Sequence, residues 1–200
     1  MNDCVILDID GVLADYRIGL LWWINVHYPI LRSVCYEHLK RTDTWLSSET
    51  MGVTLREWLD ILEKFRMSGG KLTIPAFSRA ADLTQLVHED KKKIILITSR
   101  PIDIYSNIYR DTLEWLKANR IVYDLLLWSK YKSDIIYKLR LIDGCCFAVD
   151  DELNHVRDYV SLGIKTFWLD HYDKSTNLKS PNLIRVNNLE EIINQLGVYA

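Results

Sequence analysis

The chain has 200 residues, of which 48% are apolar and 26% charged, and its formal net charge is -2. This composition suits one globular domain with room for a small insert. The near-neutral balance excludes a global attraction to nucleic acid or to an acidic membrane, although it allows a local basic groove. No apolar run reaches membrane-spanning length, and the first ten residues lack a signal-peptide pattern. We therefore expect a cytoplasmic protein without a membrane partner.

The four cysteines are expected to be reduced thiols with a structural role. They form no CxxC motif, and two of them, Cys145 and Cys146, are adjacent inside a predicted strand. This spacing favours free thiols over disulfides or a zinc site.

The first predicted element is a buried strand over residues 3–8 that leads into two carboxylates. Asp8 and Asp10 are separated by one residue, and Gly11 follows at once. Side chains alternate along a strand, so the two carboxylates can converge only if the chain turns here, which glycine permits. The carboxyl end of a buried strand is also where open α/β sheets bind ligands. Alone, the pattern is weak evidence, because surface loops produce it as well.

Residues 14–74 are predicted to form a small all-helical insert. An apolar helix around residues 20–26 ends at Pro29, because a helix interior rejects proline. A shorter helical pattern covers about residues 33–40, and Thr54 is a typical N-cap for a third helix.

After the insert, helical and strand patterns alternate regularly. This alternation predicts an α/β fold in which helices cover both faces of a parallel sheet. The expected helices span 76–89, 103–119, 133–141, 152–162 and 188–196, and the expected strands span 94–97, 124–128, 145–149, 165–169 and 183–186.

Four of the predicted strands end in residues that can carry chemistry. In a parallel sheet these ends lie along one edge, so residues distant in sequence meet there. Several carboxylates in one place repel one another unless a cation lies among them, and carboxylates with water suit Mg²⁺. A hydroxyl, a lysine and an arginine beside that cation would bind phosphate. Such a site can transfer a phosphoryl group, with one aspartate as nucleophile and another as acid and base. The residues are Asp8 and Asp10; Thr98, Ser99 and Arg100; Lys130 and Lys132; and Asp150 and Asp151.

The order of these groups excludes a response-regulator receiver. Receivers carry the acid pair on the first strand, a threonine later and the lysine last. Here the adjacent acids Asp150 and Asp151 follow Lys132.

The chain resembles the haloacid dehalogenase (HAD) superfamily of phosphohydrolases. Four motifs of that superfamily occur in order: DIDGV at 8–12, ILITS at 95–99, Lys132 within KYKSD, and AVDD at 148–151. The resemblance covers nearly the whole chain, and four ordered motifs are far more specific than any one of them.

The resemblance implies a role for each motif residue. Asp8 would be the nucleophile that forms an aspartyl-phosphate, and Asp10 would be the general acid and base. Thr98 would bind the transferring phosphoryl group, with Ser99 and Arg100 beside it. Lys132, with Lys130 as the alternative, would neutralise Asp8 and a phosphate oxygen. The Mg²⁺ ligands would be Asp8, the Asp10 carbonyl, Asp150 and Asp151.

A narrower resemblance points to nucleotides as substrates. The run DGVLADYRIGLLWWINVHYP at 10–29 is similar to the start of the 5'(3')-deoxyribonucleotidases, in which the insert is a C1-type cap over small substrates. Arg100 departs from that family, which tends to have proline there, and the gap from Lys132 to Asp150 is longer. Both departures are more similar to the phosphatase half of polynucleotide kinase–phosphatases.

Aromatic residues of the insert have two interpretations. Four of the seven tryptophans, Trp22, Trp23, Trp45 and Trp58, lie there, and aromatics at helical spacing usually pack a small core. Alternatively, some of them stack on a base. Tyr16 occupies the position of an aromatic in the nucleotidases, so Tyr16, Trp22 and Trp45 are the candidate base contacts.

Together these observations predict an α/β protein with a HAD-like Rossmannoid core over 1–13 and 75–200 and a helical cap over 14–74. The predicted activity is Mg²⁺-dependent hydrolysis of a small phosphomonoester, a (deoxy)nucleoside monophosphate, by a monomer or homodimer. The alternatives are a 3'-phosphatase acting on nucleic-acid ends and an inactive HAD-like binding module.

Overall fold

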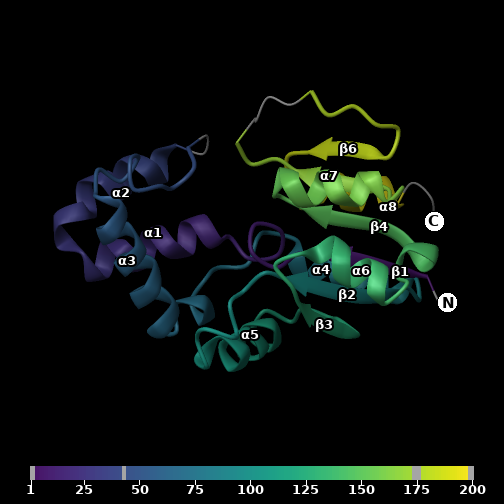
Figure 1. Cartoon of the computed structure of the whole chain (residues 1–200), viewed down its shortest axis with the longest axis horizontal. Coiled ribbons are helices and arrows are strands. Elements are labelled where there is room, and N and C mark those ends of the chain that lie inside the picture. The colour runs from purple at the N-terminus through teal and green to yellow at the C-terminus, as the bar shows by residue number, and fades with distance from the viewer. Residues whose placement is uncertain (1–2, 42–43, 173–176, 198–200) are drawn as a thin grey trace. The chain divides into compact units, whose positions relative to one another are not determined.

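The computed structural model describes residues 3–41, 44–172 and 177–197, and the chain divides into two compact units (Figure 1). The first unit comprises Met1–Ala14, Ala76–Arg100 and Asn119–Ala200, and the second comprises Asp15–Pro75 and Pro101–Ala118. Contacts thus group residues 101–118 with the insert. The predicted domain division, which placed them in the core, stays a prediction.

The first unit is built on a six-stranded parallel sheet in the order β3-β2-β1-β4-β5-β6. The predicted fold class, an α/β parallel sheet with helices inserted after the first strand, is therefore confirmed. The strands are β1 (Cys4–Leu7), β2 (Lys93–Thr98), β3 (Leu125–Trp128), β4 (Cys145–Asp150), β5 (Thr166–Leu169) and β6 (Leu183–Val186).

The position of β1 in the middle of the sheet explains why its sequence is uniformly apolar. It pairs with β2 on one side and β4 on the other, and all four of its residues are buried. A strand covered on both faces reads as a continuous apolar run rather than an alternation. The predicted strand over 3–8 is thus confirmed, and the residue that follows β1 is Asp8.

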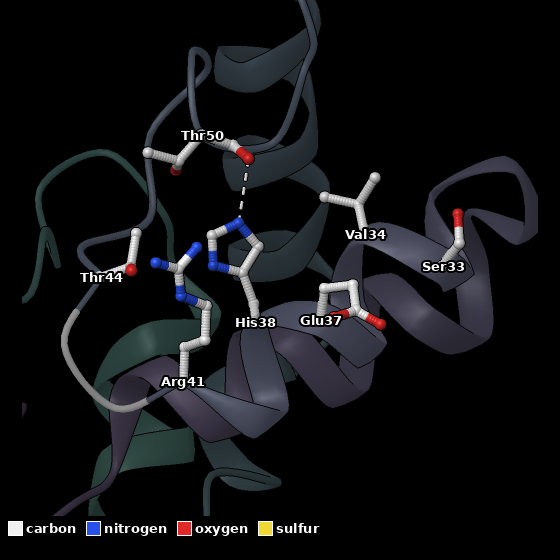
Figure 2. Close-up of a pocket in the computed structure, with 7 residues that line it drawn as sticks. All are labelled: Ser33, Val34, Glu37, His38, Arg41, Thr44 and Thr50. Atoms are coloured by element: carbon white, nitrogen blue, oxygen red, sulfur yellow. Dashed lines mark hydrogen bonds between the residues drawn. The ribbon is translucent and has the colours of Figure 1, made fainter.

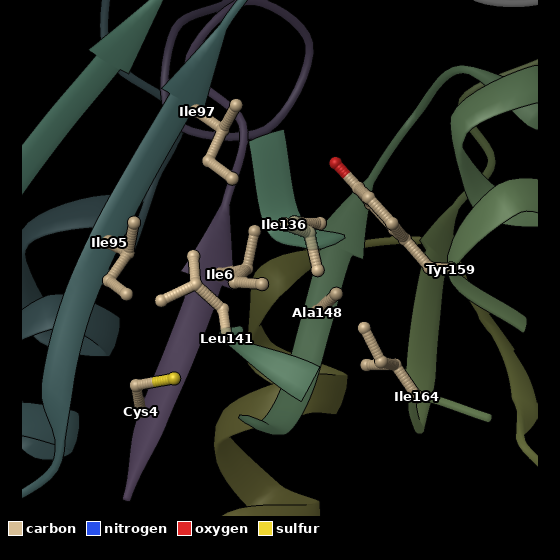
Figure 3. Packing of buried hydrophobic residues seen from close by; sticks show 9 residues of the cluster. All are labelled: Cys4, Ile6, Ile95, Ile97, Ile136, Leu141, Ala148, Tyr159 and Ile164. Carbon is tan, nitrogen blue, oxygen red and sulfur yellow. The ribbon is translucent and has the colours of Figure 1, made fainter. Parts of the chain in front are cut away.

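Helices cover this sheet. In the hydrophobic cluster of Figure 3, Ile6 lies between Ile95 and Ala148, and Ile136 of α6 and Tyr159 of α7 pack over that face. Helix α4 packs against β2 and α8. The helices of this unit are α4 (Ala80–Glu89), α6 (Lys132–Lys138), α7 (Leu153–Ser161) and α8 (Leu189–Gly197), and a 3-10 turn, η3, spans Ile142–Gly144.

Helix α4 begins four residues later than its pattern suggested. Ala76 forms an antiparallel bridge with Ala14, and the Phe77 amide donates to the Leu13 carbonyl. These contacts hold residues 76–77 in an extended conformation, so the helix starts only at Ala80.

The second unit is helical. The expected helices of the insert are confirmed, and α1 ends before Pro29 as the proline required. The Trp115 indole donates to the Ile74 carbonyl at 2.6 Å, which ties α5 to the end of the insert. The elements are α1 (Tyr16–His27), α2 (Arg32–Lys40), α3 (Leu55–Met67) and α5 (Asn107–Ala118), with 3-10 turns η1 (Pro29–Leu31) and η2 (Gly70–Leu72).

A groove lies beside α2 in this unit (Figure 2). The buried His38 donates from Nε2 to the Thr50 carbonyl oxygen at 2.9 Å. Because a carbonyl can only accept, this nitrogen carries the proton. One of the residues that line the groove, Glu37, carries a carboxylate. The lining residues are Ser33, Val34, Glu37, His38, Arg41, Thr44 and Thr50.

The expectations about membrane-spanning segments and about the cysteines can be compared with this fold. Across the described ranges, no helix combines the length and the apolar character needed to cross a bilayer. All four cysteines are free, as expected from their spacing.

The start of α3 gives a prediction about stability. Thr54 and Glu57 form a capping box: Thr54 Oγ1 accepts from the Glu57 amide at 3.2 Å, and Glu57 Oε2 accepts from the Thr54 amide at 2.8 Å. Thr54→Ala should lower the free energy of unfolding by about 1 kcal/mol, measured by urea denaturation. Thr54→Ser keeps the hydroxyl and is the control. An equal loss in both variants would contradict the role of the cap.

Candidate active site

The candidate site lies at the carboxyl ends of three neighbouring strands. Asp8 directly follows β1, Thr98 is the last residue of β2, and Asp150 is the last residue of β4. Because β1 pairs with both β2 and β4 in parallel, these three ends lie next to one another. The edge predicted from the sequence is therefore formed.

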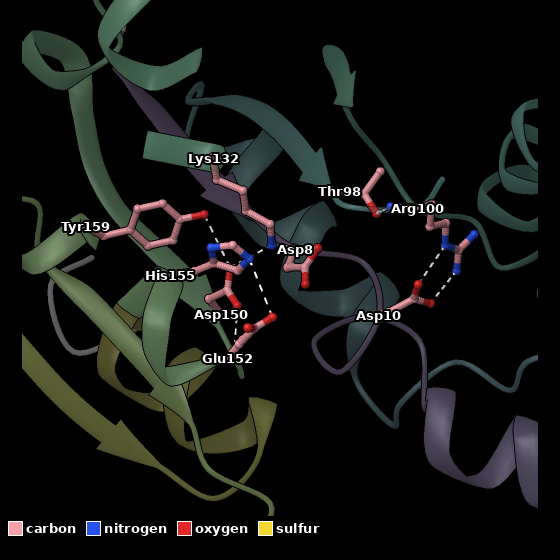
Figure 4. Close-up of polar contacts among 9 residues, drawn as sticks. All are labelled: Asp8, Asp10, Thr98, Arg100, Lys132, Asp150, Glu152, His155 and Tyr159. Atoms are coloured by element: carbon pink, nitrogen blue, oxygen red, sulfur yellow. Dashed lines mark hydrogen bonds and ion pairs between the residues drawn. The ribbon is translucent and has the colours of Figure 1, made fainter. Parts of the chain in front are cut away.

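Lys132 lies at the centre of this edge. It is the first residue of α6 and is completely buried, and its Nζ lies 2.9 Å from Asp8 Oδ1 and 2.8 Å from Asp150 Oδ2 (Figure 4). The alternative, Lys130, is exposed, and its amine lies 5.9 Å from the Tyr131 ring centre. Of the two lysines, the structure thus brings Lys132 to the aspartates.

Asp150 is fixed from three directions. Besides Lys132, its Oδ2 accepts from the Tyr159 hydroxyl at 3.3 Å, and its Oδ1 accepts from the Glu152 amide at 3.0 Å. The sequence did not single out Tyr159. The available signal was a tyrosine on the apolar face of the predicted helix 152–162, since a buried tyrosine hydroxyl usually finds a partner.

Burial and charge set the ionisation of the central pair. Burial, reinforced by the charges of Asp150 and Asp10, raises the pKa of Asp8 to about 7, and Lys132 opposes this shift. For Lys132, burial disfavours the charged form, but the charges of Asp150 and Asp8 outweigh it and raise its pKa. Lys132 is therefore a fixed positive charge, whereas Asp8 is ionised only at some cost.

Three carboxylates form a group that suits a divalent cation. Asp8, Asp150 and Asp151 each offer an oxygen, and these atoms lie within 4.8 Å of one another. Mg²⁺ prefers carboxylate oxygens together with water, so this donor set fits the ion. Asp151 lies against the turn after β1. Its carboxylate is so near that a Cβ added at Gly11 would lie 2.2 Å from the Asp151 Cγ.

The carboxylate of Asp10 lies outside this group, because the turn carries it elsewhere. Gly11 has a φ of 86° and donates to the Ala14 carbonyl at 2.8 Å, which confirms that the chain turns here. Arg100 donates to both oxygens of Asp10, from Nη2 to Oδ1 at 2.7 Å and from Nε to Oδ2 at 3.0 Å (Figure 4). Arg100 was predicted to contact phosphate, and the structure places its guanidinium on Asp10. A phosphate contact by Arg100 stays a prediction.

The other residues of the second motif differ in burial. Thr98 is buried, and its Oγ1 accepts from the Arg100 amide at 3.3 Å. Ser99 is exposed. A phosphate contact by either residue stays a prediction.

A histidine from a distant part of the chain supports the turn. His171 Nε2 lies 2.6 Å from the Gly11 carbonyl oxygen, and its ring stacks on Phe77 with centres 4.8 Å apart. No local pattern in the sequence reports this contact, because His171 and Gly11 are 160 residues apart.

The candidate base contacts belong to the second unit. Tyr16 packs edge-on against Phe65, and the Lys71 amine lies 4.0 Å from the Tyr16 ring centre. Trp22 and Trp45 are 52% and 56% exposed. Trp58 and Trp23, by contrast, pack in the insert, Trp58 buried and Trp23 against Phe65. Base stacking by Tyr16, Trp22 and Trp45 stays a prediction.

Solved structures similar to this one span nearly the whole chain. A dehalogenase with an intermediate complex has a TM-score of 0.67 at 14% identity, covering 97% of this chain and 96% of that one. An L-2-haloacid dehalogenase has a TM-score of 0.61 at 15% identity, covering 98% and 100%. The D,D-heptose 1,7-bisphosphate phosphatase from B. bronchiseptica, complexed with magnesium and phosphate, has a TM-score of 0.56 at 12% identity, covering 99% of both.

These comparisons establish a shared fold. No model of a protein family matches the chain, and no curated protein matches its sequence. The predicted HAD-like architecture is confirmed at the level of the fold, since the similar structures include dehalogenases and a phosphatase.

The packing of Gly11 gives a prediction about the site. Gly11 and Gly163 both have positive φ, 86° and 80°, but an added Cβ meets the Asp151 carboxylate at Gly11 and nothing within 4 Å at Gly163. Gly163→Ala should cost about 1 kcal/mol of stability from the backbone alone. Gly11→Ala should cost more and should also weaken the rise in melting temperature caused by Mg²⁺. Calorimetry with and without Mg²⁺ tests this. Identical behaviour of the two variants would rule out the close approach.

Proposed function

We propose that this chain, which has the fold of HAD-like hydrolases, is a Mg²⁺-dependent phosphatase that hydrolyses a phosphomonoester through an aspartyl-phosphate on Asp8. The observation that carries the proposal is the buried Lys132, whose amine lies within 2.9 Å of Asp8 and of Asp150. A buried cation between two carboxylates, together with a divalent ion that the three carboxylates would hold, would supply the positive charge that binds a phosphate dianion.

In the first half of the reaction, an oxygen of Asp8 attacks phosphorus. The bond from phosphorus to the leaving oxygen breaks, and Asp10 supplies the proton that this oxygen needs. In the second half, water attacks phosphorus and gives a proton to Asp10, and the bond from phosphorus to Asp8 breaks. The products are inorganic phosphate and the original Asp8 carboxylate, so the protons balance over the cycle.

Lys132 stabilises charge and does not transfer protons in this scheme. The two aspartates raise its pKa, so the amine stays protonated throughout. It holds Asp8 in place and offers a positive charge where the phosphoryl oxygens would lie.

Asp8, Asp150 and Asp151 would hold the Mg²⁺ ion. The ion would supply positive charge that neutralises phosphate oxygens and favours the ionised form of Asp8. This matters because burial raises the pKa of Asp8 to about 7, and only the carboxylate is a nucleophile.

The proposed substrate is a (deoxy)nucleoside monophosphate. The support comes from the similarity of residues 10–29 to the deoxyribonucleotidases and from the aromatics of the helical unit, of which Trp22 and Trp45 are more than half exposed. Exposed aromatic rings are sequence-tolerant platforms for bases.

A panel assay of phosphate release tests the activity. With Mg²⁺, the protein should hydrolyse nucleoside monophosphates faster than sugar phosphates or 3'-phosphorylated oligonucleotides, and EDTA should abolish turnover. Asp8→Asn should lower kcat/KM by at least about a thousandfold, or about 4 kcal/mol, because an amide is a poor nucleophile. The control is Asp82→Asn, because Asp82 is an exposed aspartate paired with Arg79, and this variant should keep its kcat/KM.

Each other outcome has a defined meaning. Preference for the oligonucleotide would replace the nucleotidase assignment with the 3'-phosphatase. Full activity of a folded Asp8→Asn protein would remove Asp8 from the mechanism. No phosphate release from any substrate, despite a Mg²⁺-induced rise in melting temperature, would indicate a binding module.

The aromatic residues allow a test of base recognition. If Tyr16, Trp22 or Trp45 stacks on the base, changing it to Ala should lower kcat/KM for the nucleotide about tenfold to a hundredfold. Hydrolysis of p-nitrophenyl phosphate should change little, because it has no nucleobase. Trp58→Ala is the packing control, since this buried tryptophan should affect both substrates together. Proportional loss on both substrates in every variant would exclude base stacking.

A further inference from the structure

Arg100 and Asp10 form a partly buried ion pair at one side of the candidate site. The Arg100 side chain is completely buried and the Asp10 side chain is 22% exposed. Nη2 and Nε of the guanidinium bind the two oxygens of one carboxylate, at 2.7 and 3.0 Å. In Figure 4 this pair is drawn to the right of Asp8, whereas Lys132 and Asp150 are drawn to its left.

The geometry of the pair restrains Asp10 strongly. Two parallel hydrogen bonds fix both the position and the plane of a carboxylate. The backbone on both sides is held as well: the Arg100 amide donates to Thr98 Oγ1 at 3.3 Å, and the turn after β1 is closed by the bond from Gly11 to Ala14. A charge as buried as this guanidinium is tolerated only with a partner.

We propose that Arg100 is a positioning residue that holds the Asp10 carboxylate as the base for hydrolysis of the aspartyl-phosphate. The inference rests on the proposed function. In the step concerned, the oxygen of water forms a bond to phosphorus and one proton of that water passes to an oxygen of Asp10. The bond from phosphorus to Asp8 breaks, and its electron pair returns to the Asp8 carboxylate.

The pair should matter more in this second half than in the first. Two bonds from a guanidinium hold both oxygens of the Asp10 carboxylate in place, and the second half needs one of them aligned with the attacking water. A carboxylate oxygen can accept more than one hydrogen bond, so an oxygen that the guanidinium holds can also accept one from a water molecule. An aryl phosphate, whose leaving group departs as a stable anion, needs no proton in the first half and therefore isolates the effect.

The test is stopped-flow hydrolysis of p-nitrophenyl phosphate by Arg100→Lys and Arg100→Gly in the full chain with Mg²⁺. Arg100→Lys keeps the positive charge but loses the bidentate contact with the Asp10 carboxylate. We expect kcat to fall about tenfold to a hundredfold and KM to fall with it, so that kcat/KM changes little, because a displaced base slows only the second half of the reaction. A burst of p-nitrophenol approaching the enzyme concentration should appear, since the aspartyl-phosphate accumulates.

Rescue and a matched control separate positioning from folding. Millimolar guanidinium chloride should restore the slow phase of Arg100→Gly but not that of Asp10→Asn. Arg79→Lys, an exposed arginine paired with Asp82 and Glu190, should leave both phases unchanged. If Arg100→Gly does not fold, the test rests on Arg100→Lys: a burst supports the positioning role, and its absence contradicts it.

Three outcomes would overturn the inference. A raised KM with unchanged kcat would mean that Arg100 binds the substrate phosphate. Unchanged kcat, KM and burst would mean that the pair has no part in turnover. If the unmodified protein releases no p-nitrophenol, or if its release does not depend on Asp8, the proposed function fails and the inference fails with it.

Discussion

The structure depends on one buried contact, the amine of Lys132 between Asp8 and Asp150. These carboxylates end adjacent strands, and burying them together would be costly without a compensating cation. Lys132 supplies that charge from the first turn of α6, so the start of this helix is tied to the ends of β1 and β4. The same contact places one buried positive charge at the carboxyl ends of these strands.

A second buried cation, Arg100, separates Asp10 from the other aspartates of the site. Arg100 binds Asp10, while Asp151 joins Asp8 and Asp150 in the group that can hold a metal ion. Two aspartates only two residues apart thus have different surroundings, one beside a lysine and two acids, the other on a guanidinium. In the proposed reaction, that separation suits a nucleophile and a proton carrier, which need different environments.

The separation is produced by the turn after β1. Gly11 adopts a positive φ and leaves no space for a Cβ beside Asp151, and His171 holds its carbonyl from a distant loop. The turn therefore depends on β4 and β5 as well as on its own sequence. The uniformly buried β1 provides the rigid base from which the turn departs.

The sequence by itself determined the fold class, the buried central strand, the Thr54 cap and the sheet edge on which Asp8, Thr98 and Asp150 meet. These follow from local periodicity and from the rule that parallel strands end on one edge. Only the tertiary structure decided between Lys130 and Lys132, placed Arg100 on Asp10, and brought Tyr159 to Asp150 and His171 to Gly11. Each of these is a side-chain contact between segments distant in the chain, and its direction depends on how a helix or loop packs on the sheet, which no local pattern encodes.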